Sequence, residues 1–559
     1  WGDRSGADET ASRGSFVGHA VLVSLLTVLS RITGLLRDAV LAAVFGMGVI
    51  TDAFFLGFLV PNLFRRLFGE GALSAAFIPV YSDRLRKDRL SAQRLASLCL
   101  AIMLVVLGTI TLIGEASLAW LAANVSDDTA LAIRLTMIML PYMPLICLVA
   151  VIGGMLQVHG RFGPPAAVPI VMNLTLIAGA FLATVDLYRD AALRHCIVVV
   201  AACVLVAGMI QLAWQVLAVL EVETFTACFA GAGTAMHQVV RAMLPMMVGL
   251  AVFQINAFLD SLIAWGLSPA APAAIPLGMS PETGETPMLN FFGAQIRYPL
   301  RTGSVAALHW SQRLYQFPLG VFGIAIATAI YPALVRAAPP FARADGRFEQ
   351  ILRQGLRLAV FIGLPASVGL LLVRLPLTRL VYEHGHFTPK DVHRVAQILA
   401  GYGCAVWAYS MTHVLTRAFY AVKDTVTPMK ISVLMVGLNL LLNLILIWYL
   451  GAAGLAWSTA ICAVVQVIIL VRAVAGHVAH PVDADVWRAW GRSVCLTGVM
   501  AGALGVLTLW IKPADLDPIA SGIVLLIMVA LGAAVYLGGA WFVGADELKW
   551  LSRAKRGAE

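Results

Sequence analysis

Long apolar runs, each bounded by charged residues, glycines or prolines, divide almost the whole chain of 559 residues. A membrane-spanning helix needs about 20 predominantly apolar residues, and these runs reach or exceed that length. Apolar residues make up 60% of the chain and charged residues only 12%, whereas a soluble domain is about 25% charged. The sequence therefore predicts an all-α polytopic membrane protein. About fourteen spans are predicted, at residues 19–44, 50–80, 92–122, 129–158, 164–185, 195–219, 237–266, 303–334, 350–380, 391–421, 427–449, 452–476, 487–511 and 517–543.

A faint internal repeat relates the two halves of the chain. Asn173 follows the end of the fourth predicted span much as Asn439 follows the end of the tenth, and the Arg65-Arg66-Leu-Phe run resembles Arg313-Leu-Tyr. Repeated halves around a midplane site are typical of secondary transporters. The expected parts are an N-lobe at 17–220, a C-lobe at 235–476, two appended spans within 487–543 and a tail at 544–559; residues 1–16 are expected to be disordered or foreign to the native chain.

The loops predict the orientation of the chain in the membrane. The connection at residues 84–94 carries five Lys or Arg residues, whereas the loops after the first, third and eleventh spans carry none. Because positively charged loops stay in the cytoplasm, both termini are predicted to be cytoplasmic. The connection at 267–301, rich in Pro, Gly and Thr, is predicted to be a flexible loop. The net charge of +9 is scattered over short loops, so no nucleic-acid partner is expected.

The stretch from Ser30 to Tyr81 is apolar enough to lie in a bilayer, yet it carries several charges. A charge at the bilayer centre costs about 2.5–3.5 kcal/mol on insertion scales, so each of these charges needs a function or a partner. Arg31 lies near the middle of its span, with no acidic residue three or four positions away. Structural pairing is the alternative for the others, because neighbouring acidic and basic residues can neutralise one another. The candidates here are Arg31, Arg37, Asp38, Asp52, Asn62, Arg65, Arg66 and Glu70.

Arg313 adds a guanidinium group about ten residues into the eighth span, so three spans contribute arginines. Guanidinium groups bind phosphate oxygens in forked pairs. The arginines therefore predict an anionic, phosphate-bearing ligand, with structural ion pairing as the alternative.

A second polar group is predicted in the C-terminal half. Asp260 lies in the seventh span, Asn439 and Asn443 are four residues apart in the eleventh, and Thr459 lies in the twelfth. A carboxylate with amide and hydroxyl oxygens suits a hard cation, which makes a coupling site for Na⁺ or H⁺ one interpretation. Hydrogen bonds between helices are the other. No P-loop is present, so direct ATP drive is not expected, and no other cofactor or catalytic residue is predicted.

Several motifs occur in one order from about residue 20 to about residue 540. They are SRITGLLRDAVLAAVFG, TDAFFLGFLVPNLFRRLFGEGALSAAFIPVYSD, QRLYQFPLGVFGIAIATAIYP, YEHGHFTPKD, RAFYAVKDTVTPMK and LNLLLNLILI. Together they resemble the MurJ/MviN family of lipid II flippases, within the multidrug/oligosaccharidyl-lipid/polysaccharide (MOP) exporter superfamily. The resemblance implies two pseudo-symmetric six-helix lobes around a central cavity, and two C-terminal helices that form a groove for a lipid tail.

The resemblance also implies a function. Such a protein carries lipid II, an undecaprenyl-pyrophosphate-linked muropeptide, across the bacterial inner membrane by alternating access for cell-wall synthesis. Its expected partners are lipid II and membrane lipids, and it is expected to be a monomeric transporter and not an enzyme. The motifs assign substrate binding to Arg31, Arg37, Asp52, Arg65 and Arg313, support to Asp38, Asn62, Arg66, Glu70 and Gln316, and a Na⁺ site to Asp260, Asn439, Asn443 and Thr459.

The chain departs from the family pattern near Arg313 and at the cation site. Gln312 and Gln316 stand where acidic residues are frequent, and Asn443 stands where an Asp can occur. The cation site therefore has one charge fewer, which leaves Na⁺ dependence open. The rival functions are export of another polyprenyl-linked oligosaccharide or of drugs, a membrane glycosyltransferase, and a scaffold. A cationic-drug exporter would need an excess of carboxylates, and a glycosyltransferase would need acidic catalytic motifs at a membrane face.

Overall fold

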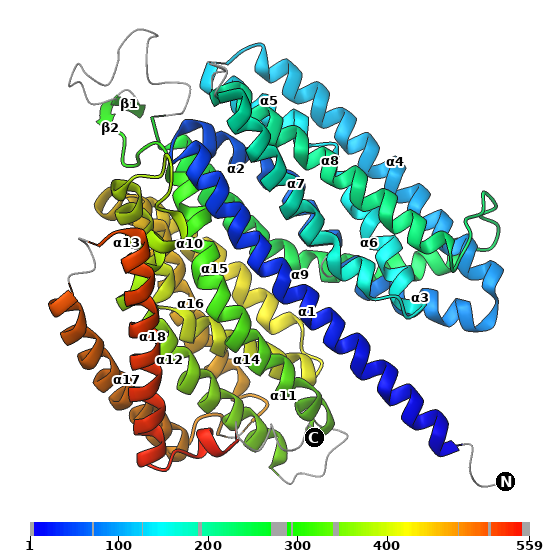
Figure 1. Ribbon diagram of the computed structural model, residues 1–559. Coiled ribbons are helices and arrows are strands. Elements are labelled where there is room, and N and C mark those ends of the chain that lie inside the picture. The colour runs from blue at the N-terminus through cyan, green and yellow to red at the C-terminus, as the bar shows by residue number, and fades with distance from the viewer. Residues whose placement is uncertain are drawn as a thin grey trace. The chain divides into compact units, whose positions relative to one another are not determined.

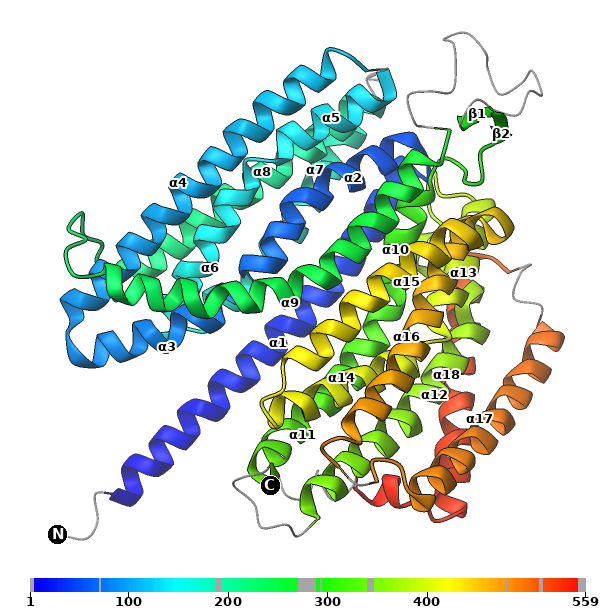
Figure 2. The same ribbon diagram turned by 180° about the vertical axis from the view of Figure 1, so that it is seen from behind.

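The computed structural model describes residues 5–69, 72–125, 127–187, 193–269, 288–291, 294–338, 346–478, 480–511 and 516–550. Its helices (Figures 1 and 2) fall into two compact units, residues 1–258 with 269–297 and residues 259–268 with 298–559. The division falls inside helix α9 (Gly233–Gly266), whereas the sequence placed it between residues 220 and 235. The two C-terminal helices, expected as an appended pair, belong to the second unit.

The first unit is built from helices that run back and forth. They are α1 (Ser5–Phe45), α2 (Val49–Phe64), a π-helical segment (Arg65–Gly69), α3 (Ala72–Lys87), α4 (Arg89–Ala122), α5 (Asp127–Met139), α6 (Tyr142–Val158), α7 (Gly163–Leu187), α8 (Leu193–Leu220) and most of α9. Helix α1 begins at Ser5, inside the segment expected to be disordered.

Small residues set the helix spacing in this unit. Between membrane helices, association depends on close packing and not on the hydrophobic effect, which favours glycine at contacts. A Cβ on Gly208 of α8 would lie 2.6 Å from a ring carbon of Tyr142 on α6, and a Cβ on Gly179 of α7 would lie 2.7 Å from the Cys203 sulfur of α8. Helix α8 therefore packs tightly against α6 and α7.

The second unit contains the remaining helices. They are α10 (Ser304–Pro318), a second π-helical segment (Leu319–Gly323), α11 (Ile324–Ala337), α12 (Arg347–Tyr382), α13 (Pro389–Gly403), α14 (Val406–Ala421), α15 (Val426–Leu450), α16 (Ala452–Val474), α17 (Ala484–Ile511) and α18 (Pro518–Phe542). Helix α12 packs against α13, α14, α17 and α18, and it forms the centre of the unit.

A single glycine joins α15 to α16. Gly451 has a φ of +57°, in the left-handed region that glycine adopts without a Cβ penalty. A Cβ on Gly454 would lie 2.6 Å from the Leu446 carbonyl oxygen, so the two backbones are in contact at the turn. This tight connection places the polar residues of α15 beside those of α16.

The outer faces of the described helices are apolar. Within the described ranges, ten helices are long and apolar enough to cross a membrane. The expected total of about fourteen spans stays a prediction. Exposed tryptophans lie near helix ends, at Trp120 of α4, Trp510 of α17 and Trp541 of α18, as expected where a helix meets the membrane interface. The fold is that of a polytopic helical membrane protein.

The connection between α9 and α10 differs from the flexible loop that was predicted. It contains an antiparallel hairpin of strands β1 (Met288–Phe291) and β2 (Ala294–Arg297), with Met288 opposite Arg297. The sequence signal was weak because the hairpin follows a run rich in proline and glycine.

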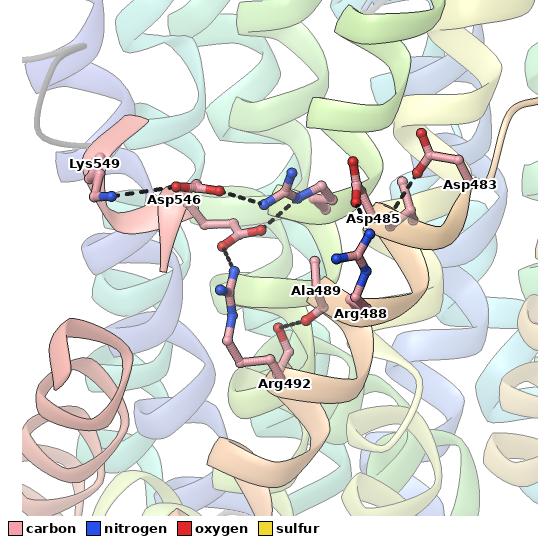
Figure 3. Close-up of polar contacts among 11 residues, drawn as sticks. Asp483, Asp485, Arg488, Ala489, Arg492, Asp546 and Lys549 are labelled. Carbon is pink, nitrogen blue, oxygen red and sulfur yellow. Dashed lines mark hydrogen bonds and ion pairs between the residues drawn. The ribbon is translucent and has the colours of Figure 1, made fainter. Parts of the chain in front are cut away.

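The start of the predicted tail packs onto the second unit. Glu547 is 1% exposed and accepts hydrogen bonds from Arg357 of α12 at 2.7 Å and from Arg492 of α17 at 2.5 Å. Arg357 also pairs with Asp546 at 3.4 Å and lies 4.7 Å above the Trp550 ring. Figure 3 shows the hydrogen bonds and ion pairs of this network beside the exposed pair of Arg488 and Asp485. The segment therefore ties α17 to α12.

Replacing Glu547 with Gln should destabilise the second unit. The change leaves Arg357 and Arg492 without their shared charge, and breaking a buried ion pair costs about 3–5 kcal/mol. Both arginines keep some solvent contact, so we expect a loss of about 1–3 kcal/mol, measured as a lower Tm in detergent. Asp485→Asn breaks an exposed pair and serves as the control. A Tm for Glu547→Gln no lower than the control's would contradict the prediction.

Candidate functional site

Arg37 and Asp38 form a buried ion pair on α1. The Nε and Nη2 atoms of Arg37 donate to Asp38 Oδ1 at 2.9 and 2.6 Å, and Nη1 donates to Asn173 Oδ1 on α7 at 3.1 Å. The Asn173 amide donates in turn to the Ser30 carbonyl and the Thr33 hydroxyl, each at 3.1 Å. Arg37 and Asp38 therefore join α1 to α7, and a substrate contact by Arg37 stays a prediction.

Arg31 has different surroundings from Arg37. Arg31 is exposed, whereas Arg37 is 8% exposed. The two residues are six positions apart, which places them about 240° apart around the helix axis. The exposed guanidinium of Arg31 is available to a ligand.

The start of α2 holds a second buried acid. Asp52 is fully buried in the first turn of α2, where the helix dipole favours a carboxylate. The Thr51 hydroxyl beside it accepts a hydrogen bond from the Gly48 amide at 3.0 Å. Asp52 therefore lies at a helix start that is fixed by its own capping contacts.

Arg65 and Arg66 occupy the π-helical segment after α2. The Nε atom of Arg65 donates to Asn62 Oδ1 at 3.0 Å, and Arg66 Nη1 donates to Gln254 Oε1 of α9 at 3.2 Å. Glu70, the predicted partner of Arg66, lies outside the described residues. Both arginines are half-buried, and π-helical turns are frequent at functional sites.

The two π-helical segments resemble each other locally. Arg65–Gly69 and Leu319–Gly323 both end in Phe-Gly and precede a helix with an internal proline. The predicted match of Arg65-Arg66-Leu-Phe with Arg313-Leu-Tyr stays a prediction, and Arg313 has a different backbone setting from Arg65 and Arg66. Arg313 belongs instead to the regular helix α10.

The neighbours of Arg313 on α10 also have defined contacts. Gln312 Nε2 donates to the Tyr402 hydroxyl of α13 at 3.1 Å. The Gln316 carbonyl accepts from the Leu319 amide, where the π-helical segment begins. Arg313, Gln312 and Gln316 are all half-buried.

The four residues predicted for a cation site come together. Asn443 Nδ2 donates to Asp260 Oδ1 at 2.6 Å and to Asn439 Oδ1 at 2.9 Å, and Asn439 Nδ2 donates to the Thr459 hydroxyl at 3.2 Å. Ser458, which the sequence reading missed, donates to Asn443 Oδ1 and is fully buried. The one sequence feature that could have indicated Ser458 is its position next to Thr459 in the chain. Asp260, 3% exposed, thus lies in a set of carboxylate, amide and hydroxyl groups.

The contacts described for the buried aspartates Asp38 and Asp260 differ between the two units. The predicted repeat matches Asn173 of α7 with Asn439 of α15. Asn173 accepts from Arg37, which pairs with Asp38, and Asn439 accepts from Asn443, which also donates to Asp260. In the first unit, the Arg37 guanidinium contacts both Asp38 and Asn173. The contacts described for Asp260 and Asn443 are with amide and hydroxyl groups. The carboxylate, amide and hydroxyl oxygens around Asp260 are the ligands that a hard cation binds, which makes this cluster a candidate cation site.

A further polar cluster, absent from the sequence predictions, lies around the loop after α8. Glu223, 2% exposed, accepts from Gln93 at 2.6 Å and from Arg89 at 3.1 Å on α4. His159 Nε2, at the end of α6, lies 3.6 Å from Glu223 Oε2 and 3.2 Å from the Tyr81 hydroxyl. Burial raises the pKa of Glu223, but the hydrogen bonds from Gln93 and Arg89 outweigh burial and hold this pKa below its usual value.

Known proteins resemble this chain along most of its length. The model of the family described as "Lipid II flippase MurJ" matches residues 41–279 and 286–529. This chain belongs to the MurJ family. A "Probable lipid II flippase MurJ" of Vibrio cholerae is 30% identical over 515 residues, covering 88% of this chain and 90% of the relative. A "Lipid II flippase MurJ" of Burkholderia cenocepacia is 27% identical and covers 95% and 98% of the two chains.

Solved structures show the same fold. One described as "Lipid II flippase MurJ, inward closed conformation" matches with a TM-score of 0.72 at 23% identity, covering 94% of this chain and 99% of that chain. An inward-facing MATE family transporter of the MOP superfamily matches with a TM-score of 0.60 at 14% identity, covering 80% and 96%. The expected fold class is confirmed: the protein is an all-α polytopic membrane protein with the fold of these transporters.

Acidification should weaken the cluster around Glu223 through His159. Burial holds the pKa of His159 below its usual value despite the nearby Glu223 carboxylate. The unfolded chain therefore binds more protons, and stability that is present above about pH 6.5 is lost as the pH falls below it. We expect the wild-type Tm to fall between about pH 7.5 and pH 5.5, and that of His159→Gln to fall less. The exposed His384→Gln is the control. An equal fall in all three proteins would refute the prediction.

Proposed function

We propose that this protein transports lipid II across the bacterial inner membrane by alternating access. The observation that carries the proposal is the family match along residues 41–279 and 286–529. The chemistry agrees, because α1, the first π-helical segment and α10 each carry an arginine that is exposed or half-buried. Lipid II, the substrate named for the relatives, carries a pyrophosphate, and guanidinium groups bind phosphate oxygens through forked hydrogen bonds.

The arginines divide into substrate-binding and framework residues in this proposal. Arg31, Arg65 and Arg313 bind the pyrophosphate, and Asn62 orients Arg65 through their 3.0 Å hydrogen bond. Arg37 acts through the fixed position that it gives α1. The buried Asp52, the Gln254-bound Arg66, Gln316 and Asp38 support these positions, with Glu70 assigned the same role on its motif alone.

The polyprenyl tail would lie along α17 and α18. These helices pack against each other and expose large apolar side chains, among them Val499, Val506, Leu526 and Val529. The tail stays in a hydrocarbon environment at such a surface while the charged headgroup crosses. The proposed orientation places both termini in the cytoplasm, because the loop at 84–94 carries five basic residues and positively charged loops stay in the cytoplasm. The protein would act as a monomer.

Coupling to Na⁺ or H⁺ is the second part of the proposal. Asp260, Asn439, Asn443, Ser458 and Thr459 provide the oxygen atoms that a hard cation binds. A buried charged carboxylate is costly, and Asp260 is 3% exposed. Cation binding or protonation would neutralise Asp260. The bound cation would supply charge neutralisation, and the side chains hold α9, α15 and α16 together around it.

The rival within the superfamily is export of another polyprenyl-linked oligosaccharide or of drugs. The structural likeness to MATE transporters concerns the fold alone. The arginines disfavour a cationic drug, because like charges repel. Competition by undecaprenyl pyrophosphate carrying other glycans would show how narrowly the headgroup is recognised.

Removing either Arg31 or Arg313 should impair transport without unfolding the protein. A lost charge-assisted hydrogen bond costs about 1.5–3 kcal/mol, so Arg31→Ala and Arg313→Ala should each lower the rate of lipid II headgroup exposure in proteoliposomes by about 10- to 100-fold. Arg86→Ala, at a side chain that is 77% exposed, is the control. Wild-type rates in both variants, with normal insertion, would exclude the assigned roles.

Replacing Asp260 with Asn should remove the cation dependence. The asparagine can still accept from Asn443, so the helices stay together while the charge is lost. We expect Na⁺, compared with K⁺, or a change in pH to shift the wild-type Tm and transport rate, and to shift those of Asp260→Asn much less. Asp485→Asn on the exposed face of α17 controls for a lost surface charge. An unchanged ion response in Asp260→Asn would disprove the site.

A further inference from the structure

Tyr402, at the end of α13, lies between the cation-site helices and the helix that carries Arg313. It is 1% exposed, and its hydroxyl accepts the hydrogen bond from Gln312 Nε2 at 3.1 Å. Gln312 immediately precedes Arg313 on α10. Helix α13 packs against both α10 and α16. Tyr402 therefore contacts α10 from a helix that also packs against α16, which carries Ser458 and Thr459 of the Asp260 cluster.

The contact between α13 and α16 leaves no room for sliding. A Cβ on Gly401 would lie 2.7 Å from the Ala456 Cβ and 2.9 Å from the Trp457 amide nitrogen. Only glycine permits this approach of two helix backbones. The next residue along α16 is Ser458, which donates to Asn443. A displacement of α16 at the Asp260 cluster would therefore move the end of α13 with it.

Aromatic packing adds a second contact between Tyr402 and α10. Tyr315 of α10 stacks on Tyr402 with ring centroids 5.0 Å apart and an interplanar angle of 24°. Tyr315 also packs on Tyr409 of α14 at 5.6 Å. Rings in this offset geometry attract one another, so Tyr315 follows Tyr402 when α13 moves.

We propose that Tyr402 is a positioning residue that couples cation binding at Asp260 to the placement of Arg313. The route runs from Asp260 through Asn443 and Ser458 to α16, across Gly401 to Tyr402, and through Gln312 to α10. This inference rests on the proposed cation coupling. Coupling is reciprocal, so substrate binding at Arg313 tightens cation binding by the same factor.

The test separates ion binding from coupling. Na⁺ binding is measured as the rise in Tm in NaCl over KCl, and lipid II binding as a Kd in nanodiscs in each salt. A parallel pair of measurements at two pH values in KCl tests the proton as the coupling ion. In the wild type, the coupling ion should lower the lipid II Kd by about 5-fold or more.

Tyr402→Phe removes the hydroxyl that accepts from Gln312 but keeps the ring that stacks on Tyr315. We expect its Tm response to the ion to be retained, its lipid II Kd without the ion to stay within about twofold of wild type, and the ion effect on Kd to fall towards onefold. Tyr409→Phe is the matched control. It removes a buried hydroxyl that has no hydrogen-bond partner among the described residues, and it should keep the full ion effect.

A second variant keeps the test independent of any effect peculiar to Tyr402→Phe. Gln312→Leu removes the donor of the same hydrogen bond, so it should lose the ion effect too, and the double variant should lose no more than either single one. An ion effect on Kd that persists in Tyr402→Phe and Gln312→Leu would overturn the coupling role alone. A wild type with no ion response in either Tm or Kd would overturn both this inference and the proposed cation coupling.

Discussion

A buried carboxylate in a helix bundle must be neutralised, and this requirement shapes both units. In the first unit, Arg37 neutralises Asp38 and also reaches Asn173 on α7. In the second, Asp260 contacts the Asn443 amide, with Ser458 and Asn439 completing the cluster. A buried ion pair offsets its desolvation cost only when its geometry is good and further hydrogen bonds satisfy the remaining polar atoms. Arg37 is part of the chain, whereas the oxygen atoms around Asp260 have the chemistry to bind an ion.

This difference suits a transporter with two related halves. The Arg37 guanidinium is part of the chain, so its contact between α1 and α7 needs no external ion. A free cation or proton can come and go, so the contacts among α9, α15 and α16 can strengthen and weaken. A ligand shifts a conformational equilibrium only through different affinities for the two states. The Asp260 cluster has the chemistry for such a difference, and the Arg37 cluster does not.

The sequence predicted the local features well and the distant contacts poorly. Fold class followed from the apolar runs, and the set of Asp260, Asn439, Asn443 and Thr459 followed from polar residues in apolar surroundings. Glu223 and Glu547 were missed because their partners lie far away in the chain: Arg89 is 134 residues from Glu223, and Arg357 is 190 from Glu547. Hydrophobic periodicity carries no information on such pairs.

The π-helical segments are a feature that the sequence did not predict. Each unit contains one, and both end in Phe-Gly, at Phe68-Gly69 and at Phe322-Gly323. A π-turn inserts one residue into a helix and changes which face the following side chains occupy. The first unit places Arg65 and Arg66 inside that turn, whereas the second places Arg313 before it, in regular helix. The second unit's arginine is therefore positioned by its helix neighbours, among which Gln312 and Tyr315 contact Tyr402. Two halves of common design thus hold their arginines by different means, one through an irregular backbone and the other through contacts that lead back to a buried acid.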